Sequence, residues 1–502
     1  MLQLLNFSEK FFKRAALVFF IGLFAVGCFT FSDYGLFVDE AAQHNIGEVN
    51  YNFIKNGNTK ELLACDDKYH GPAFEIFLYA AEKLVNVTEV RSVFLLRHAL
   101  NFLVFFIGTY FFYLLGFKLF KSRGIGLLCS VLLVASPRIY SDSFYDSKDL
   151  IMLSLCIIST YTTFLFLERQ TIWLALIHAL CCGLTIDVRI MGLLIPIATI
   201  YLFVMQKNKR IIPLLFFVSY TLLFTIAFWP VLWINPVLHF IGAFKQMSHF
   251  PQPISMLYRG GYVSTMQLPW HYLPFWLLIS TPLFYILLFF TGLFFAVKNT
   301  LQQFLNTLHI QFFLFMFATP IMAVIILNST VYDSWHHVFF VYPYFLLIAV
   351  YGFTELIPTL KNKSIPKIII YSTILSIAFT LTFMIVNHPF QNVYFNLLAG
   401  KNVRENFELD YAGMSYRQGL EYILANDKSP TIHIAATLGE CQLNFSIIPA
   451  EDRKRLFWTD NPETANYYLS NFRWHPTDYK TGTSVFQVNV GNEKIMEVLK
   501  LR

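Results

Sequence analysis

Two adjacent carboxylates, Asp39 and Glu40, stand directly after the first long apolar segment, where a polar loop begins that runs to about Arg91. A carboxylate in such a place can take or orient the proton of a hydroxyl or amine while an anomeric bond to phosphate breaks. Asp39 is therefore a candidate catalytic base, and Glu40 would bind the acceptor or position Asp39. The alternative is that both acids only cap the loop in the solvated headgroup layer.

A second polar cluster is squeezed between two apolar segments and contains Arg138, Asp146, Lys148 and Asp149. Cations at a membrane boundary suit a phosphate group, and Lys148 could hold a leaving phosphate as a point charge. We count all four residues as candidate substrate-binding residues. Asp149 begins a predicted helix, so its alternative role is to complement the helix dipole as a cap.

Two further groups of polar residues meet apolar segments. Arg189, two residues after Asp187, is another phosphate-binding candidate, unless it snorkels or forms an internal ion pair. His336 and His337 could bind phosphate or sugar, and Trp335 could stack on a sugar ring or belong to the aromatic belt of the interface. Two neighbouring histidines without a third ligand at helical spacing are a poor zinc signal, so we expect no metal site and no cofactor. A requirement for a divalent cation stays open.

The composition indicates which elements must hold these residues. Of 502 residues, 56% are hydrophobic and 14% charged, with 55 Phe, whereas soluble domains carry about 25% charged residues. A membrane-spanning helix needs about 20 apolar residues. Apolar segments of about that length predict about eleven spans, near 15–32, 93–116, 124–140, 149–167, 171–186, 188–205, 211–233, 272–297, 308–328, 338–356 and 366–386. We expect an α-helical polytopic membrane protein.

Basic residues in short loops favour the cytoplasm and so predict the orientation. Lys10, Lys13 and Arg14 precede the first span, which places the N-terminus inside and leaves residues 15–31 as an uncleaved anchor rather than a signal peptide. The net charge of +6 lies mostly in the inner loops, so it implies no nucleic-acid partner. The candidate residues all fall on the predicted outer face. The expected location is a bacterial inner membrane, with the lipid bilayer as a partner.

The sequence divides into two predicted domains. Residues 1–386 form the transmembrane domain, whose outer loop 33–92 carries the acids, and 387–502 form a small extracytoplasmic α/β domain. The domain's expected elements are a helix at 414–426 and strands at 431–436, 465–469 and 485–490. We expect an amphipathic interfacial helix ending near Val85, and functional loops at 45–70 and 234–271. Cys65 and Cys441 could pair, since both are placed outside.

Several motifs, taken in their order along the chain, carry a resemblance. They are Asp39-Glu40, Tyr69-His-Gly-Pro72, Arg97-His98, Lys148-Asp149, Asp187-Val-Arg189, Asp333-Ser-Trp-His-His337, the stretch 394–400 and the stretch 408–416. Through them the chain resembles the GT-C class of membrane glycosyltransferases, specifically the bacterial relatives of protein O-mannosyltransferases and of the lipid A aminoarabinose transferase, similar to glycosyltransferase family 39. The resemblance covers roughly residues 1–425.

The resemblance implies an inverting transfer of a sugar from a polyprenyl-phosphate donor at the outer face, without a nucleotide sugar. Asp39 matches the family's first-loop base or acceptor ligand, and basic residues of the outer loops would hold the lipid phosphate. The acceptor stays open among protein, lipid A and other glycolipids. The alternatives are a polytopic transporter or flippase of a lipid-linked sugar, a polymerase or ligase that uses the same carrier, and a scaffold protein. Transporters usually place ionisable groups near the midplane, whereas these lie at one face.

Overall fold

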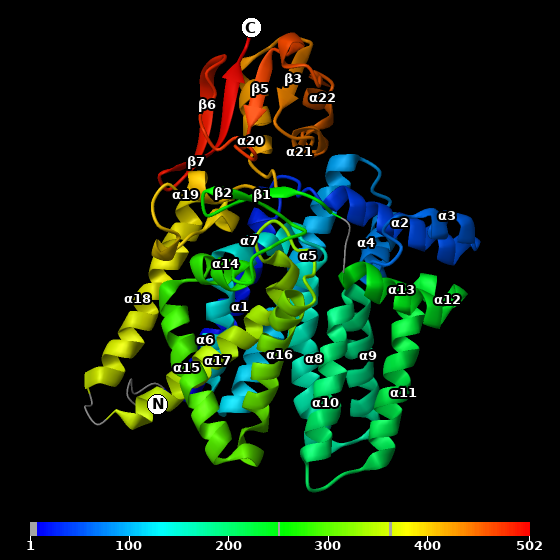
Figure 1. Ribbon diagram of the computed structural model, residues 1–502, viewed down its shortest axis with the longest axis vertical. Coiled ribbons are helices and arrows are strands. Elements are labelled where there is room, and N and C mark those ends of the chain that lie inside the picture. The colour runs from blue at the N-terminus through cyan, green and yellow to red at the C-terminus, as the bar shows by residue number, and fades with distance from the viewer. Residues whose placement is uncertain (1–7, 249–251, 361–363) are drawn as a thin grey trace.

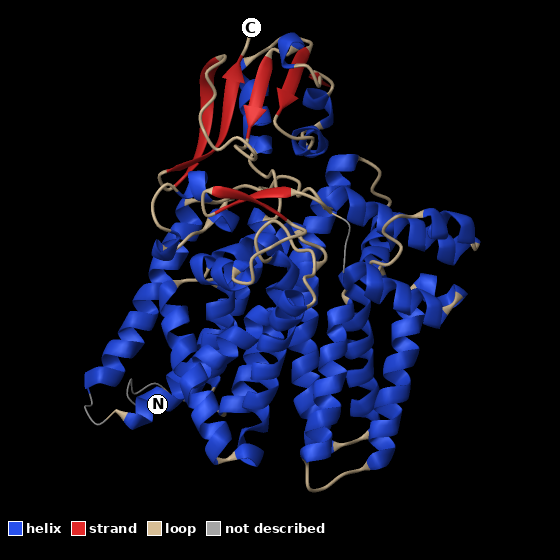
Figure 2. Cartoon of the chain, in the orientation of Figure 1, coloured by secondary structure: helices blue, strands red, loops and turns tan. Residues whose placement is uncertain are grey.

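The computed structural model describes residues 8–248, 252–360 and 364–502. Figure 1 shows a bundle of long helices with a small sheet domain stacked on one end, and the C-terminus at the far tip of that domain. A two-stranded hairpin lies between the two parts, and short helices project sideways from the same end of the bundle (Figure 2). We call this end of the bundle, which faces the sheet domain, the sheet-side end.

The helical part follows the chain from the N-terminus to Val386. Its helices and 3-10 turns (η) are α1 (Glu9–Thr30), α2 (Glu40–Asn56), α3 (Thr59–Ala64), α4 (Ala73–Leu84), α5 (Val90–Phe120), α6 (Arg123–Val134), α7 (Pro137–Tyr145), α8 (Asp149–Arg169), α9 (Ile172–Val188), η2 (Ile190–Leu193), α10 (Leu194–Met205), α11 (Ile211–Phe228), α12 (Pro230–Ile234), α13 (Pro236–Ser248), α14 (Tyr272–Ser280), α15 (Leu283–Gln302), η3 (Phe304–Thr307), α16 (Leu308–Ile326), η4 (His336–Val341), α17 (Tyr342–Thr359) and α18 (Ser364–Val386).

The bundle confirms a multi-pass membrane protein. Within the described residues, 8 helices are long and apolar enough to cross a membrane, or 9 if the bent pair α6 and α7 is one span. Two shorter apolar helices, at 172–188 and 190–205, match the remaining predicted spans. α8 and α17 are buried in the centre, whereas α1, α11 and α18 expose long rows of apolar side chains, as lipid-facing helices do.

Two predicted spans are interrupted, and a proline stands at each break. The span predicted at 272–297 ends as α14 at Ser280, because Thr281 is extended (φ −103°, ψ 141°) and Pro282 precedes α15. In the span predicted at 124–140, α6 and α7 meet at Pro137 with a bend of 70°. A residue before proline avoids helical angles, and proline has no amide hydrogen to continue the ladder.

The segment predicted as a functional loop at 45–70 is mostly helical, so that prediction is wrong. α2 and α3 occupy 40–56 and 59–64, and together with α4 they form an arm at the sheet-side end (Figure 1). α2 buries Ile46, Val49 and Asn50, which recur at helical spacing but are diluted by polar neighbours. The interfacial helix expected to end near Val85 is α4, whose Leu84 is exposed while Leu78 is buried. The stretch 234–271 likewise contains α13 and the hairpin strands β1 (Ser255–Tyr258) and β2 (Gly261–Ser264).

The C-terminal part is an α/β unit, as the sequence predicts. Its elements are η5 (Gln391–Val393), η6 (Leu397–Ala399), α19 (Val403–Asn406), α20 (Tyr416–Asn426), β3 (Ile432–Ala436), α21 (Glu440–Leu443), η7 (Asn444–Ile447), α22 (Ala450–Arg453), β4 (Leu456–Trp458), η8 (Pro462–Thr464), β5 (Tyr467–Ser470), β6 (Thr483–Val490) and β7 (Glu493–Lys500). The five strands are ordered β4-β3-β5-β7-β6, parallel around β3 and antiparallel around β7.

α18 ends at Val386, and the turns η5 and η6 then contact α7 and α14 before the chain enters the sheet domain. Asn396 ties this passage to α14 through hydrogen bonds from its side-chain amide to the Leu278 and Thr281 carbonyls, both 2.6 Å. Cys65 and Cys441 are free thiols in the described chain, so the disulfide that the sequence left open does not form.

Candidate functional site

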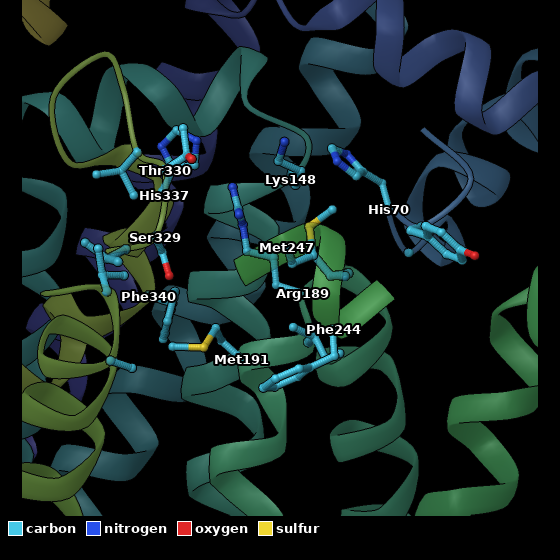
Figure 3. Close-up of a pocket in the computed structure, with 18 of the residues that line it drawn as sticks. His70, Lys148, Arg189, Met191, Phe244, Met247, Ser329, Thr330, His337 and Phe340 are labelled. Carbon is cyan, nitrogen blue, oxygen red and sulfur yellow. The ribbon is translucent and has the colours of Figure 1, made fainter. Parts of the chain in front are cut away.

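A cavity opens at the sheet-side end of the bundle, where the ends of several helices meet. It has an empty volume of about 910 Å³, mouth included, and is lined by the loop before α4, the start of α8, the junction of α9 and η2, α13, the end of α16, and η4. Figure 3 shows Lys148, His70 and His337 at one end of the cavity, with Arg189 reaching toward them. Met191 and Phe244 lie at the opposite end, so the cavity has a basic end and an apolar end.

The basic end brings together residues from distant parts of the sequence. Lys148, Arg189 and His337, which the sequence analysis singles out, all line the cavity, and His70 joins them. Lys148 and Arg189 keep 14% and 15% of their side chains exposed, so their charges are partly shielded from water yet open to a ligand. At such partial burial, the attraction between these cations and an anion is stronger than at a free surface.

Asp39 stands beside this basic end. Its Oδ2 lies 3.9 Å from Nζ of Lys148, and 28% of its side chain is exposed. Asp39 occupies the N-cap position of α2, but among the described residues its side chain accepts no capping hydrogen bond. Asp39 is not among the residues that line the cavity, and it adjoins the basic end through Lys148.

Glu40 points elsewhere. Its carboxylate is buried, accepts a hydrogen bond from the Phe37 amide at 2.8 Å, and lies 3.0 Å from Nε2 of His98 on α5. These contacts fix the turn that leads into α2, so Glu40 holds the segment that carries Asp39. This geometry is that of a residue that positions Asp39; both roles named for Glu40 stay predictions.

Asp146 and Asp149 support the cations and face the cavity only indirectly. Asp146 is buried and accepts hydrogen bonds from the backbone amides of Lys148 (3.1 Å) and Asp149 (2.7 Å), which fixes the start of α8. Asp149 forms a short ion pair with Arg189, and its Oδ2 lies 4.0 Å from Nε2 of His336. Both acids thus orient the basic end. The ion pair between Asp149 and Arg189 agrees with the alternative named for Arg189, and the position of Asp149 at the start of α8 agrees with the cap named for Asp149.

Arg138 and Trp335 do not line the cavity, so the geometry gives no support to their predicted contact with substrate, which stays a prediction. Arg138 is 1% exposed and its guanidinium lies 4.8 Å from the ring centroid of Phe395. Trp335 is also 1% exposed, and its indole N–H donates to Ser280 Oγ at 2.7 Å. A ring buried in this way can neither stack on a sugar nor join an interfacial belt, so Trp335 packs the core behind the site.

His70 is the site residue to which the sequence analysis assigns no role, although Tyr69-His-Gly-Pro72 is among its motifs. Burial, with the neighbouring charges of Lys148 and Arg189, holds the pKa of His70 well below its usual range, so the ring is neutral at pH 7. Asp67 approaches His70 at 3.9 Å. Burial raises the pKa of Asp67, and Asp39 and Asp66 raise it further against the opposing effect of Lys148.

Asp187 holds this loop in place. Its Oδ1 accepts a hydrogen bond from the Ala73 amide at 2.8 Å, at the first turn of α4. Gly71 passes so close that a Cβ added there would lie 1.4 Å from the Asp187 carbonyl oxygen. Only glycine fits at this contact, which explains why the Gly-Pro pair follows His70. In the described chain, no group of three or more His, Cys, Asp or Glu side chains has metal-binding geometry.

Comparison with known proteins finds solved structures with a similar fold. The sequence matches no protein-family model and no curated protein. The fold is similar to that of ArnT from Cupriavidus metallidurans in the apo state, with a TM-score of 0.50 and 11% identity over 96% of this chain and 98% of that chain. The same ArnT bound to undecaprenyl phosphate aligns with a TM-score of 0.48 and 12% identity over the same shares.

The apo oligosaccharyltransferase of Archaeoglobus fulgidus aligns with a TM-score of 0.46 and 11% identity over 86% of this chain and 62% of that chain. Identities this low carry information on the fold alone. The resemblance inferred from the ordered motifs is confirmed at that level: the chain has a GT-C-like glycosyltransferase fold.

Proposed function

We propose that this protein transfers a sugar from a polyprenyl-phosphate-linked donor to an acceptor, with inversion at the anomeric carbon. The observation that carries the proposal is the cavity with Lys148 and Arg189 at its basic end, an apolar opposite end, and the open carboxylate of Asp39 beside Lys148. A polyprenyl phosphate has the same division, with an anionic head and a long apolar chain.

The basic end suits the donor phosphate. A polyprenyl-phosphate sugar is a phosphodiester with one negative charge, and the polyprenyl phosphate that leaves gains a second charge as the bond to the sugar breaks. Lys148 and Arg189 would therefore interact more strongly with the transition state than with the bound donor, which is the condition for faster chemistry. His70, whose ring is neutral, and His337 place ring nitrogen atoms beside the same phosphate.

The apolar end suits the isoprenoid chain. Met191 and Phe244 lie there (Figure 3), and Phe244 is 54% exposed; Leu327, which also lines the cavity, is 46% exposed. Exposed apolar side chains that continue from a cavity onto the lipid-facing surface form a path by which a membrane lipid can enter. ArnT, the protein with the similar fold, also has a structure bound to undecaprenyl phosphate, which is consistent with a donor of this class.

Asp39 would act as the base. The acceptor O–H or N–H attacks the anomeric carbon, its proton passes to the Asp39 carboxylate, and the bond from that carbon to the phosphate oxygen breaks. The bonding electrons leave with the polyprenyl phosphate, so one displacement inverts the configuration. Lys148 lines the cavity and its Nζ lies 3.9 Å from Oδ2 of Asp39, which puts the proposed base next to the proposed phosphate site. The acceptor is a protein, lipid A or another glycolipid.

The proposed location is a bacterial inner membrane, with the N-terminus in the cytoplasm and the site and sheet domain outside. The turn between α5 and α6, which is rich in Lys and Arg, supports this orientation because it lies at the end of the bundle opposite the sheet domain (Figure 1). Labelling of single cysteines introduced at Lys121 and at exposed Lys480 with a membrane-impermeant reagent tests it. Reaction at position 480 alone in intact cells is the expected result.

The decisive experiment measures transfer from a panel of radiolabelled polyprenyl-phosphate sugars to membrane extract. Wild type is compared with Asp39→Asn, and with Asp33→Asn as a control for a carboxylate outside the cavity that pairs with His388 at 2.9 Å. Transfer that survives Asp33→Asn and is lost in Asp39→Asn is the expected result.

Folded wild type that transfers no sugar from any donor contradicts the proposal. Movement of the intact lipid-linked sugar across vesicles without transfer would then identify the flippase alternative. An Asp39→Asn variant as active as wild type removes Asp39 from the chemistry while leaving the donor site in place.

A further inference from the structure

The sheet domain sends one buried arginine into the helical part. Arg473, just after β5, is 6% exposed and its Nη2 lies 2.7 Å from Oδ1 of Asp333. Its Nη1 donates to the Tyr411 carbonyl at 3.1 Å, and its Nε lies 3.9 Å from Oε1 of Glu408. A guanidinium that joins three segments in this way uses the planar geometry that lysine lacks.

Asp333 leads directly to the basic end of the cavity. Its backbone carbonyl lies 2.7 Å from Nδ1 of His336. A carbonyl only accepts hydrogen bonds, so Nδ1 carries a proton, and Nε2 lies 4.0 Å from Oδ2 of Asp149. Asp149 in turn pairs with Arg189, which lines the cavity. An unbroken series of contacts therefore runs from the sheet domain to a proposed phosphate ligand.

The segment that Asp333 begins needs such support. Asp333 and Ser334 have φ of 52° and 70°, values that are uncommon for residues other than glycine, and two such residues in succession make a turn that depends on its neighbours. Asp333 and Glu408 are 4% and 7% exposed, and burial raises the pKa of both carboxyls while Arg473 opposes that rise. Removing Arg473 would leave two buried acids without their cation, next to a strained turn.

We propose that Arg473 is a positioning residue of the donor site, which holds the 333–337 turn and through it His336, His337 and Arg189 in place for the lipid phosphate. The sheet domain is then a working part of the transferase and not a separable appendage. The identity of the ligand in this proposal rests on the proposed function, whereas the series of contacts does not.

The test compares Arg473→Met and Arg473→Lys with Arg404→Met in the full chain. Arg404 is a matched control because it lies at the same junction and its Nη1 is 2.8 Å from Oδ1 of Asp478, whose side chain is 57% exposed. Three quantities are measured: undecaprenyl phosphate binding, the KM for donor and for acceptor, and hydrogen exchange of the amides at 330–340.

Arg473→Met is expected to weaken undecaprenyl phosphate binding and raise the donor KM by about tenfold or more, with the acceptor KM unchanged. Hydrogen exchange at 330–340 becomes faster in Arg473→Met. Arg473→Lys is expected to give values between those of wild type and Arg473→Met, and Arg404→Met is expected to match wild type. Should Arg473→Met not fold, Asp333→Asn removes the ion pair with little change in shape and is expected to give the same pattern.

Unchanged exchange at 330–340 together with an unchanged donor KM in folded Arg473→Met would overturn the proposal. Equal shifts in donor and acceptor KM would also overturn it, because they indicate general loosening. If wild type binds no undecaprenyl phosphate, the proposed function fails, but the exchange measurement still decides whether Arg473 holds the turn.

Discussion

Oδ2 of Asp39 lies 3.9 Å from Nζ of Lys148, although 108 positions separate the two residues in the sequence. The two charges therefore share one environment while they face different partners, a proton to be removed and a phosphate to be released. At 3.9 Å the two charges attract each other without a short hydrogen bond, so Lys148 can also interact with a second anion. This pair couples the proposed base to the proposed leaving-group site.

Lys148→Met is expected to lower kcat for sugar transfer by roughly a hundredfold, because the lost charge acts mainly on the phosphate that forms in the transition state. Donor KM should change much less. Initial rates over a range of donor concentrations separate the two constants. Lys118→Met is the control, since Lys118 pairs with Glu168 at the other end of the bundle. A lysine variant that loses only donor affinity would contradict a transition-state role.

Asp149→Asn is expected to raise the donor KM about tenfold, because Arg189 loses the carboxylate that orients it. If Asp149 acts through Arg189, the double variant Asp149→Asn/Arg189→Met should be no worse than Arg189→Met alone. A thermodynamic cycle on kcat/KM makes this comparison. Additive losses would mean that Asp149 contacts the substrate independently.

The sequence predicts the bundle and the α/β tail, and it singles out Lys148, Arg189 and His337, which line the cavity, because apolar periodicity and the order of polar motifs are local signals. It misses β7, whose residues alternate poorly: Glu493, Lys494 and Glu497 interrupt a strand that is nevertheless buried over most of its length. It also assigns Arg138 and Trp335 to the substrate, since the sequence shows that a polar or aromatic residue lies near a membrane boundary but not which way it points. The direction of a side chain depends on contacts between residues far apart in the sequence, such as the ion pair between Arg473 and Asp333.

His70 makes the protein less stable in acid. Its pKa is held below the ordinary value of 6.5 in the folded state, so below pH 6.5 the unfolded chain binds a proton that the folded chain does not. Stability therefore falls as pH falls through this window, by at most about 1.4 kcal/mol per pH unit. His70→Gln should reduce the fall in Tm between pH 7.5 and 5.5. Exposed His433 serves as the control, and equal pH profiles for wild type and His70→Gln would refute the role of His70.

Gly71→Ala is expected to destabilise the site strongly, because the new Cβ would overlap the Asp187 carbonyl. Overpacking against backbone costs about 1–3 kcal/mol, and the displaced loop carries His70. The measurements are Tm and the rate of transfer. Gly439→Ala is the control, since a Cβ there meets nothing within 4 Å. A Gly71→Ala protein with unchanged Tm and rate would show that the loop does not need this contact.

The apolar end of the cavity predicts a dependence on the length of the lipid chain. Phe244→Asp places a charge where the proposed isoprenoid chain passes, and it should raise the KM for a long-chain donor about tenfold while leaving a short-chain donor nearly unaffected. The short-chain donor is the internal control, because it uses the same phosphate site and the same base. A variant that slows both donors equally would indicate a damaged fold. A variant that slows neither would place the chain on another surface, of which the apolar groove between α14, α15 and α16 that is lined by Phe289, Phe290 and Phe317 is the next to test.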